Sequence, residues 1–171
     1  MLATPAKPAD PGPGCTPELY RQVMGCFPTG VTVMTVSLPD GSRAGVTASS
    51  FNTVSMDPPL ILWSLALKAP SLAAFRAADH FAVNVLAEAQ HGLALQFARP
   101  SEDKFAGVGL VAGVTGAPLI AGALAHIECR ITQRYAGGDH EIMLGEVIAL
   151  SRDEGEPLVF RGGRFHRLTP H

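Results

Sequence analysis

Short runs of β-branched residues, separated by turn residues, are the feature that most constrains the fold of this chain. GVTVMTVSL begins at Gly30 and RAGVTAS begins at Arg43, with Pro39-Asp40-Gly41-Ser42 between them. An Asp-Gly pair between two such runs is typical of a β-hairpin, because the turn needs a positive φ that costs Gly little. We therefore expect two antiparallel strands here.

Further strands and a few short helices follow along the chain. PLILWSLAL (59–67) and FAVNVLA (81–87) are predicted to be buried strands, and the alternation over 127–134, the Gly137-Gly138-Asp139 turn and HEIMLGEVIAL predict a long hairpin. Short helices are expected after Thr16, in SLAAFRAAD (71–79) and in EAQHGLALQFAR (88–99). The predicted fold class is mainly β: an antiparallel barrel with a few short helices.

Composition limits the possible partners. A net charge of -2 supplies no basic field for nucleic acid. The apolar run 59–67 is about half of the roughly 20 residues that a membrane helix needs, so no membrane span is expected. Three cysteines without C-x-x-C spacing indicate a reducing compartment and no metal site, and we predict a cytoplasmic protein.

Residues 1–15 are proline-rich and are predicted to be a flexible tail. Residues 16–171 are predicted to form a single domain.

Familiar nucleotide and hydrolase signatures are missing from the sequence. GVGLVAG (107–113) departs from the dinucleotide-binding G-x-G-x-x-G spacing, and there is no G-x-x-x-x-G-K-[ST], G-x-S-x-G or H-E-x-x-H. The sequence therefore gives no support for a Rossmann domain, a P-loop ATPase, an α/β-hydrolase or a zincin.

Three features have both a functional and a structural interpretation. The small residues of TASSF (47–51) could let a ligand lie against the backbone, or could form an ordinary edge strand that faces water. His140, in a glycine turn, could be functional or simply solvated. Asn84, in an apolar strand, could bond the backbone internally or face a ligand.

Several blocks, taken in order, resemble the short-chain flavin reductases, the reductase components of two-component flavin monooxygenases. They are FPTGVTVMT, GVTASSFNTVSMDPPL, KAPS, HFAVNVLAEAQ, DKF, GGDH and EPLVFRGGRF, and they span about residues 18–165. The resemblance implies a Greek-key split β-barrel that binds FMN or FAD, usually as a homodimer. It also implies an NAD(P)H:flavin oxidoreductase that transfers hydride from NADH or NADPH and supplies reduced flavin to a partner monooxygenase.

The resemblance also assigns roles to residues. Thr47, Ala48, Ser49, Ser50 and Phe51 match the segment that meets the flavin ring and ribityl chain. Lys68 and Ser71 match positions near the flavin phosphate. Asn84 matches a position near the cofactor. His140 matches a histidine that lies beside the nicotinamide and would orient the nicotinamide ring. Ser49 stands where many relatives have Asn.

Two alternatives share the same barrel. One is a flavin-dependent reductase with another electron acceptor, such as ferric iron, and the other is a flavin-binding module without turnover. Release of reduced flavin would distinguish a flavin reductase from the first alternative. Rapid bleaching of bound flavin by NAD(P)H would exclude the second.

Overall fold

The computed structural model describes residues 12 and 14–169. The expected flexible tail, 1–15, lies mostly outside the described residues. The first helix, α1 (Pro17–Met24), begins as the sequence predicts: the side chain of Thr16 accepts a hydrogen bond from the Leu19 N–H, and proline occupies the first helical position.

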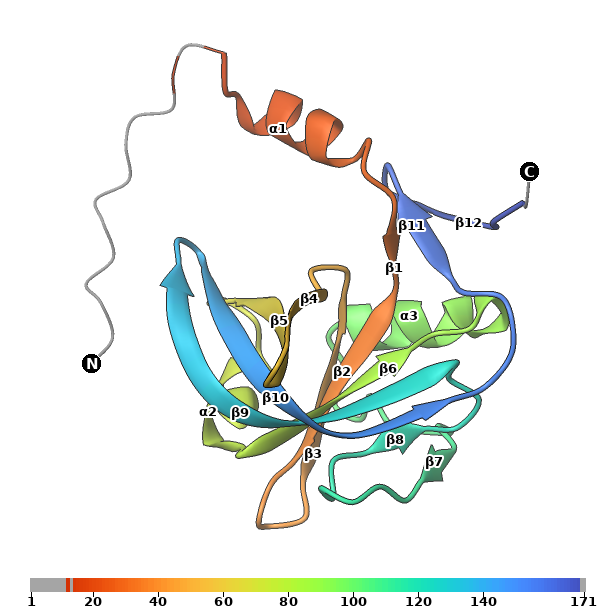
Figure 1. Cartoon of the computed structure of the whole chain (residues 1–171). Helices are drawn as coiled ribbons and strands as arrows, with labels where there is room; N and C mark the ends of the chain where they lie inside the picture. The colour runs from red at the N-terminus through yellow and green to blue at the C-terminus, as the bar shows by residue number, and fades with distance from the viewer. Residues whose placement is uncertain (1–11, 13, 170–171) are drawn as a thin grey trace.

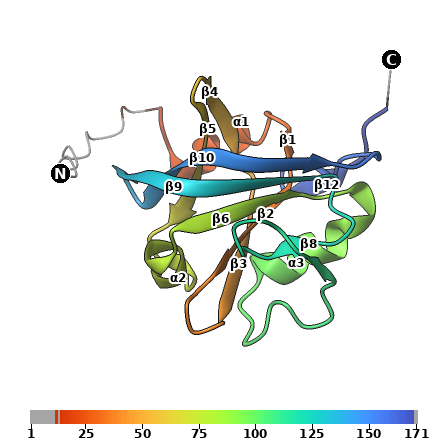
Figure 2. The same cartoon turned by 60° about the horizontal axis from the view of Figure 1, so that its bottom comes forward.

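One antiparallel sheet of seven strands organises the molecule, in the order β3-β2-β6-β9-β10-β5-β4 (Figures 1 and 2). Its strands are β2 (Thr32–Ser37), β3 (Arg43–Ala48), β4 (Asn52–Met56), β5 (Pro59–Ala66), β6 (His80–Val85), β9 (Ala125–Gly137) and β10 (His140–Arg152). The predicted hairpins are confirmed as β2–β3 and β9–β10, with register pairs such as Met34↔Val46 and Met143↔Arg134.

The chain connection between the two edge strands shows that this sheet curls. Only residues 49–51 separate β3 from β4. The four steps from Ala48 to Asn52 span at most about 15 Å, whereas the edges of a flat seven-stranded sheet lie roughly 29 Å apart. The sheet therefore bends round until its edges approach each other, which is the predicted barrel.

The remaining elements surround this barrel. The other helices are α2 (Leu72–Ala77), η1 (Glu88–Gln90) and α3 (His91–Ala98). Two small sheets are made by β1 (Thr29–Gly30), β11 (Val159–Arg161) and β12 (Arg164–His166), and by β7 (Leu110–Val111) and β8 (Leu119–Ile120). No helix in the described part of the chain combines the length and apolarity needed to cross a bilayer.

The described residues form three hydrophobic clusters, of which two are large. The larger lies inside the barrel, where Trp63 packs edge-on against Phe75 of α2, with ring centroids 5.0 Å apart. The second lies between the sheet and α3 and centres on Phe97. Gly45 in β3 permits this contact, because a Cβ there would come within 2.6 Å of the Phe97 ring.

One sequence expectation needs correction, and one of the two alternatives for 47–51 is excluded. The run 59–67 is not buried on both faces: in β5 only Ile61, Trp63 and Leu65 are buried, because the other face borders a pocket described below. The segment 47–51 is not one edge strand either. β3 ends at Ala48, and Ser49 to Phe51 form the connection that joins the two sheet edges.

Candidate functional site

A pocket of about 350 Å³ lies where the connection 49–51 passes the ends of β5 and β10. We call it the histidine pocket. It is lined by Val46, Thr47, Ala48, Ser49, Ser50, Trp63, Ser64, Leu65, Ala66, Ala69 and His140. The structure thus brings His140 together with four of the five residues of TASSF, which are 90 positions away in the sequence.

The β9–β10 turn places His140 at this pocket. Gly138 adopts a φ of 70°, which glycine tolerates at little cost, and His140 pairs with Ala66 at the end of β5. The Leu67 N–H donates a hydrogen bond of 2.9 Å to the Asp139 carbonyl. The turn is therefore fixed to the strand that forms the pocket wall.

Asp139 holds the imidazole ring. Its Oδ1 lies 2.6 Å from His140 Nδ1, and the hydrogen bond with His140, together with the attraction between the two groups, lowers the pKa of the Asp139 carboxyl. The charge of Lys68 acts in the same direction. A carboxylate at Nδ1 keeps the proton on that nitrogen, so Nε2 is left to meet a ligand.

The hydroxyl groups of TASSF do not all face the pocket as expected. Thr47 Oγ1 donates to the Ala94 carbonyl of α3, at 2.7 Å. Ser50 Oγ donates to the Ser64 carbonyl and accepts from the Ser64 N–H, at 3.1 and 3.0 Å. Thr47 thus joins β3 to α3, and Ser50 joins the 49–51 connection to β5, although Ser50 is exposed like Ser49.

Ser71 lies beside a second pocket, of about 250 Å³, which we call the Ser71 pocket. Arg43, Ser101 and Lys104 line it as well. Lys104 Nζ donates to the carbonyls of Gly45 and Phe97, at 3.2 and 2.8 Å, and burial lowers its pKa. Lys104 belongs to DKF, a block that carried the resemblance but to which the sequence assigned no role.

Lys68 and Phe51 lie at the borders of the histidine pocket. Lys68 is exposed and directly precedes Ala69, which lines the pocket. Phe51 is half-buried and lines a hollow of about 560 Å³ on the other side of the 49–51 connection, where Ser49 and Ser50 also contribute. Their predicted contacts with the cofactor stay predictions.

The Asn84 side chain lines neither the histidine pocket nor the Ser71 pocket and makes its hydrogen bonds within the protein, so its predicted place near the cofactor stays a prediction. Asn84 is fully buried, and its amide nitrogen donates to the Val33 carbonyl and to Thr35 Oγ1, at 2.9 and 3.2 Å. Its amide oxygen accepts from the Ile120 N–H, at 2.7 Å. Of the two interpretations, the internal one holds: the amide joins β2, β6 and β8.

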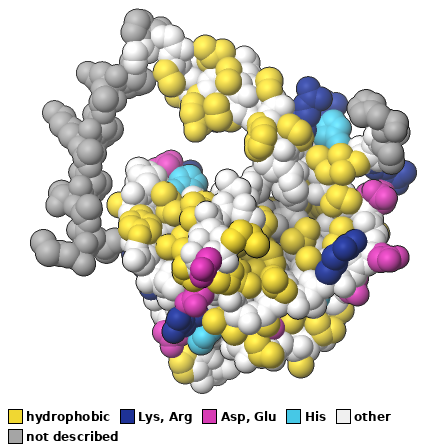
Figure 3. Space-filling view, in the orientation of Figure 1, with side chains coloured by type: hydrophobic (Ala, Val, Ile, Leu, Met, Phe, Trp, Pro, Cys, Tyr) yellow, Lys and Arg dark blue, Asp and Glu magenta, His cyan; other side chains and the backbone are white. Residues whose placement is uncertain are grey.

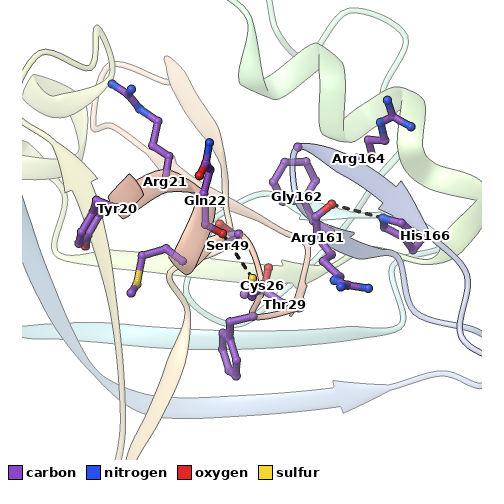
Figure 4. Close-up of a pocket in the computed structure, with 15 residues that line it drawn as sticks. Tyr20, Arg21, Gln22, Cys26, Thr29, Ser49, Arg161, Gly162, Arg164 and His166 are labelled. Atoms are coloured by element: carbon purple, nitrogen blue, oxygen red, sulfur yellow. Dashed lines mark hydrogen bonds between the residues drawn. The ribbon is translucent and has the colours of Figure 1, made fainter. Parts of the chain in front are cut away.

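A hollow of about 850 Å³ lies between α1 and the β11–β12 hairpin. Figure 4 shows Ser49 at its edge, with Tyr20 and Arg21 from α1 and Arg161, Arg164 and His166 from the hairpin. It includes neither His140 nor the other residues of TASSF. We therefore take the histidine pocket as the candidate site.

The histidine pocket suits a flat aromatic group. Ala48, Ser49, Ala66 and Ala69 are small, so a ring can lie close to the backbone, and the volume falls within the usual range for a ligand site. Among the described residues no three His, Cys, Asp or Glu side chains gather as a metal site would require. The lining has one titratable side chain, His140, which fits orientation of a ligand better than nucleophilic catalysis.

The fold and site define a split-barrel protein that binds a planar cofactor, and comparison with known proteins gives the family. The model of the flavin reductase like domain matches residues 24–169. The chain belongs to this family. The recognised resemblance and the fold class are confirmed.

Individual relatives are consistent with this family assignment. A stachydrine N-demethylase reductase subunit of Rhizobium meliloti is 43% identical over 87% of this chain, which spans 65% of that relative's length. An NADH-dependent FAD reductase of Streptomyces globisporus is 45% identical over 99% of this chain and 94% of its own. A flavin-dependent monooxygenase reductase subunit, HsaB of Rhodococcus jostii, is 38% identical over 90% of this chain and 79% of its own.

A solved structure shows the same fold. The Streptomyces globisporus NADH:FAD oxidoreductase SgcE6, in complex with NAD and FAD fragments, superposes with a TM-score of 0.86. It is 46% identical, over 96% of this chain and 98% of that one.

Proposed function

We propose that this protein catalyses the NADH-dependent reduction of FAD or FMN in the histidine pocket and supplies the reduced flavin to a partner monooxygenase. The observation that carries the proposal is the position of His140: a carboxylate-held imidazole faces a wall of small residues wide enough for a flat ring. The FAD reductase and the monooxygenase reductase subunit among the relatives support it.

Different residues of the histidine pocket would bind the flavin and the nicotinamide. When bound, flavin supplies a ring that accepts hydride from the nicotinamide. The backbone of 48–50 would lie along one face of this ring, and Ser49 would supply a hydroxyl at its edge. His140 would accept a hydrogen bond at Nε2 from the nicotinamide amide, and so hold the nicotinamide in the geometry that transfer needs.

An anaerobic experiment tests the proposal directly. Purified protein with FAD or FMN is mixed with NADH or NADPH, and the flavin absorbance is followed by stopped flow. We expect bleaching that is faster with NADH, followed by release of reduced flavin on filtration. Flavin that binds but is not bleached by either nucleotide would contradict the proposed activity.

The proposed assembly is a homodimer in which α1 packs on a second copy. No residue of α1 is buried, and Leu19, Tyr20, Val23 and Met24 are 46% to 57% exposed. Figure 3 shows these hydrophobic side chains along α1, held apart from the barrel. An eight-residue helix is unstable alone in water, so a covering surface is needed. A cytoplasmic location stays a prediction.

A further inference from the structure

Glu141 directly follows His140 but lies on the opposite face of the sheet. His140 pairs with Ala66, and Glu141 pairs with Leu65, whose side chain points into the core. Side chains alternate along a strand, so His140 faces the pocket while Glu141 faces α2 underneath. There the Nη2 and Nε of Arg76, in α2, donate to Glu141 Oε2 at 2.7 and 3.0 Å.

The partner strand is tied to the same helix. Arg134 of β9 donates through Nη2 to the carbonyls of Phe75 and Ala78, at 3.2 and 3.0 Å. These carbonyls lie at the C-terminal end of α2, where a cation is favourable. We call Arg76, Arg134 and Glu141 the α2 clamp.

This part of the hairpin has little other support. The pairing of β6 with β9 ends at His80↔Arg130, so the last residues of β9 have a sheet neighbour on one side, β10. The α2 clamp supplies contacts from α2. The same α2 follows Lys68 to Ser71, so it links the hairpin to a segment that borders both pockets.

The burial of the carboxylate makes the ion pair important for geometry. The Glu141 side chain is 12% exposed and that of Arg76 is 52% exposed. Among the described residues Glu141 Oε1 has no hydrogen-bond partner, and the contacts to Oε2 come from Arg76. Loss of Arg76 would leave a nearly buried charge uncompensated, and the hairpin would shift to bring it towards water.

We propose that the Arg76–Glu141 ion pair is a positioning device that sets the place of His140 over the bound flavin. The inference rests on the proposed role of His140 towards the nicotinamide. Neither Arg76 nor Glu141 lines the histidine pocket, and the pair acts through the strand that carries His140. Its loss should therefore affect use of NADH more than affinity for flavin.

The test compares two Arg–Glu pairs on the same molecule. Glu141→Gln and Arg76→Met remove the clamp pair. Glu146→Gln and Arg130→Met remove the control pair, which joins β9 to β10. The apparent KM for NADH, kcat, flavin Kd and Tm are measured for each. We expect the clamp variants to raise KM roughly three- to tenfold with flavin Kd within about twofold, and the control variants to leave both unchanged.

Two further variants decide between positioning and general destabilisation. The charge swap Arg76→Glu with Glu141→Arg should recover most of the KM. In a His140→Ala background Glu141→Gln should add nothing, because the residue that it positions is gone. Equal losses in NADH use and flavin affinity, or an additive effect in that background, would overturn the proposal.

The outcomes also separate this proposal from the one on which it rests. A raised KM in His140→Ala with an unchanged KM in both clamp variants refutes the clamp alone. An unchanged KM in His140→Ala refutes the role of His140, and the clamp proposal with it. Because Glu141→Gln leaves no buried charge behind, it provides a result even if Arg76→Met does not fold.

Discussion

Ser49 and Ser50 are adjacent and chemically identical, yet the structure gives them different roles. Ser50 bonds both backbone groups of Ser64 and so joins the 49–51 connection to β5, whereas Ser49 lines three hollows. The hydroxyl pattern of TASSF predicted a ligand segment, but it could not predict which hydroxyls are used within the protein.

These roles predict different effects of the same substitution. Ser50→Ala removes the hydroxyl that bonds two backbone groups of Ser64 and should lower the free energy of unfolding by about 0.5–1.5 kcal/mol. Ser49→Ala should leave stability unchanged and weaken flavin binding by roughly three- to tenfold. Urea unfolding and flavin titration of both variants check this. An equal loss of stability in the two would contradict the distinction.

Asp139 offers a second test at the level of single residues. Asp139→Asn keeps a side chain of similar size but removes the charge that holds His140 Nδ1. The ring can then turn or change tautomer, so the apparent KM for NADH should rise roughly two- to fivefold, less than in His140→Ala. Steady-state kinetics at several NADH concentrations measures the change. A larger effect than that of His140→Ala would show that Asp139 acts directly on the ligand.

At the scale of elements, Glu128 of β9 fixes the loop that leads to β8. Its side chain is buried, and its carboxylate accepts hydrogen bonds from the Val114 N–H, the Thr115 N–H and Thr115 Oγ1. Burial alone raises the pKa of Glu128, but the bonds from Thr115 and Val114 outweigh it, and the pKa lies below the ordinary value. The folded state therefore favours the charged carboxylate.

The sign of this shift predicts a pH dependence. A depressed pKa in the folded state stabilises the protein above the ordinary glutamate pKa of about 4.3, and the stabilisation is lost as pH falls below it. Glu128→Gln should be less stable than the wild type by about 1–3 kcal/mol at neutral pH, with the difference narrowing towards pH 3. Urea unfolding from pH 3 to 7 measures it. A constant difference across this range would contradict the assignment.

The sequence predicted elements better than their internal contacts. Hairpins β2–β3 and β9–β10 follow from Asp40-Gly41 and Gly137-Gly138, because turns depend on local backbone preferences. Ion pairs such as Arg76–Glu141 join residues 65 positions apart, and no local pattern marks them. Asn84 shows the same limit: its polarity in an apolar strand was evident, but its partners come from β2 and β8.

At the scale of the molecule, α1 predicts the oligomeric state. Replacing Leu19 and Val23, which are 46% and 51% exposed, by Asp should turn a dimer into a monomer, because charges in an apolar interface lose their water. Arg21→Ala, on the same helix but 76% exposed in its side chain, is the matched control. Sedimentation velocity at micromolar concentration with flavin measures the mass. A wild-type monomer that retains activity would refute the proposed homodimer.

Trp63 is the one tryptophan of the chain, and it is fully buried where the barrel core meets the histidine pocket. Indole fluorescence from this protein therefore arises at a single, rigid position. Flavins absorb light at the wavelengths that indole emits, so a flavin in that pocket should quench the emission by resonance energy transfer. The protein thus contains its own optical probe of flavin occupancy, and the departure of reduced flavin can be followed without a label.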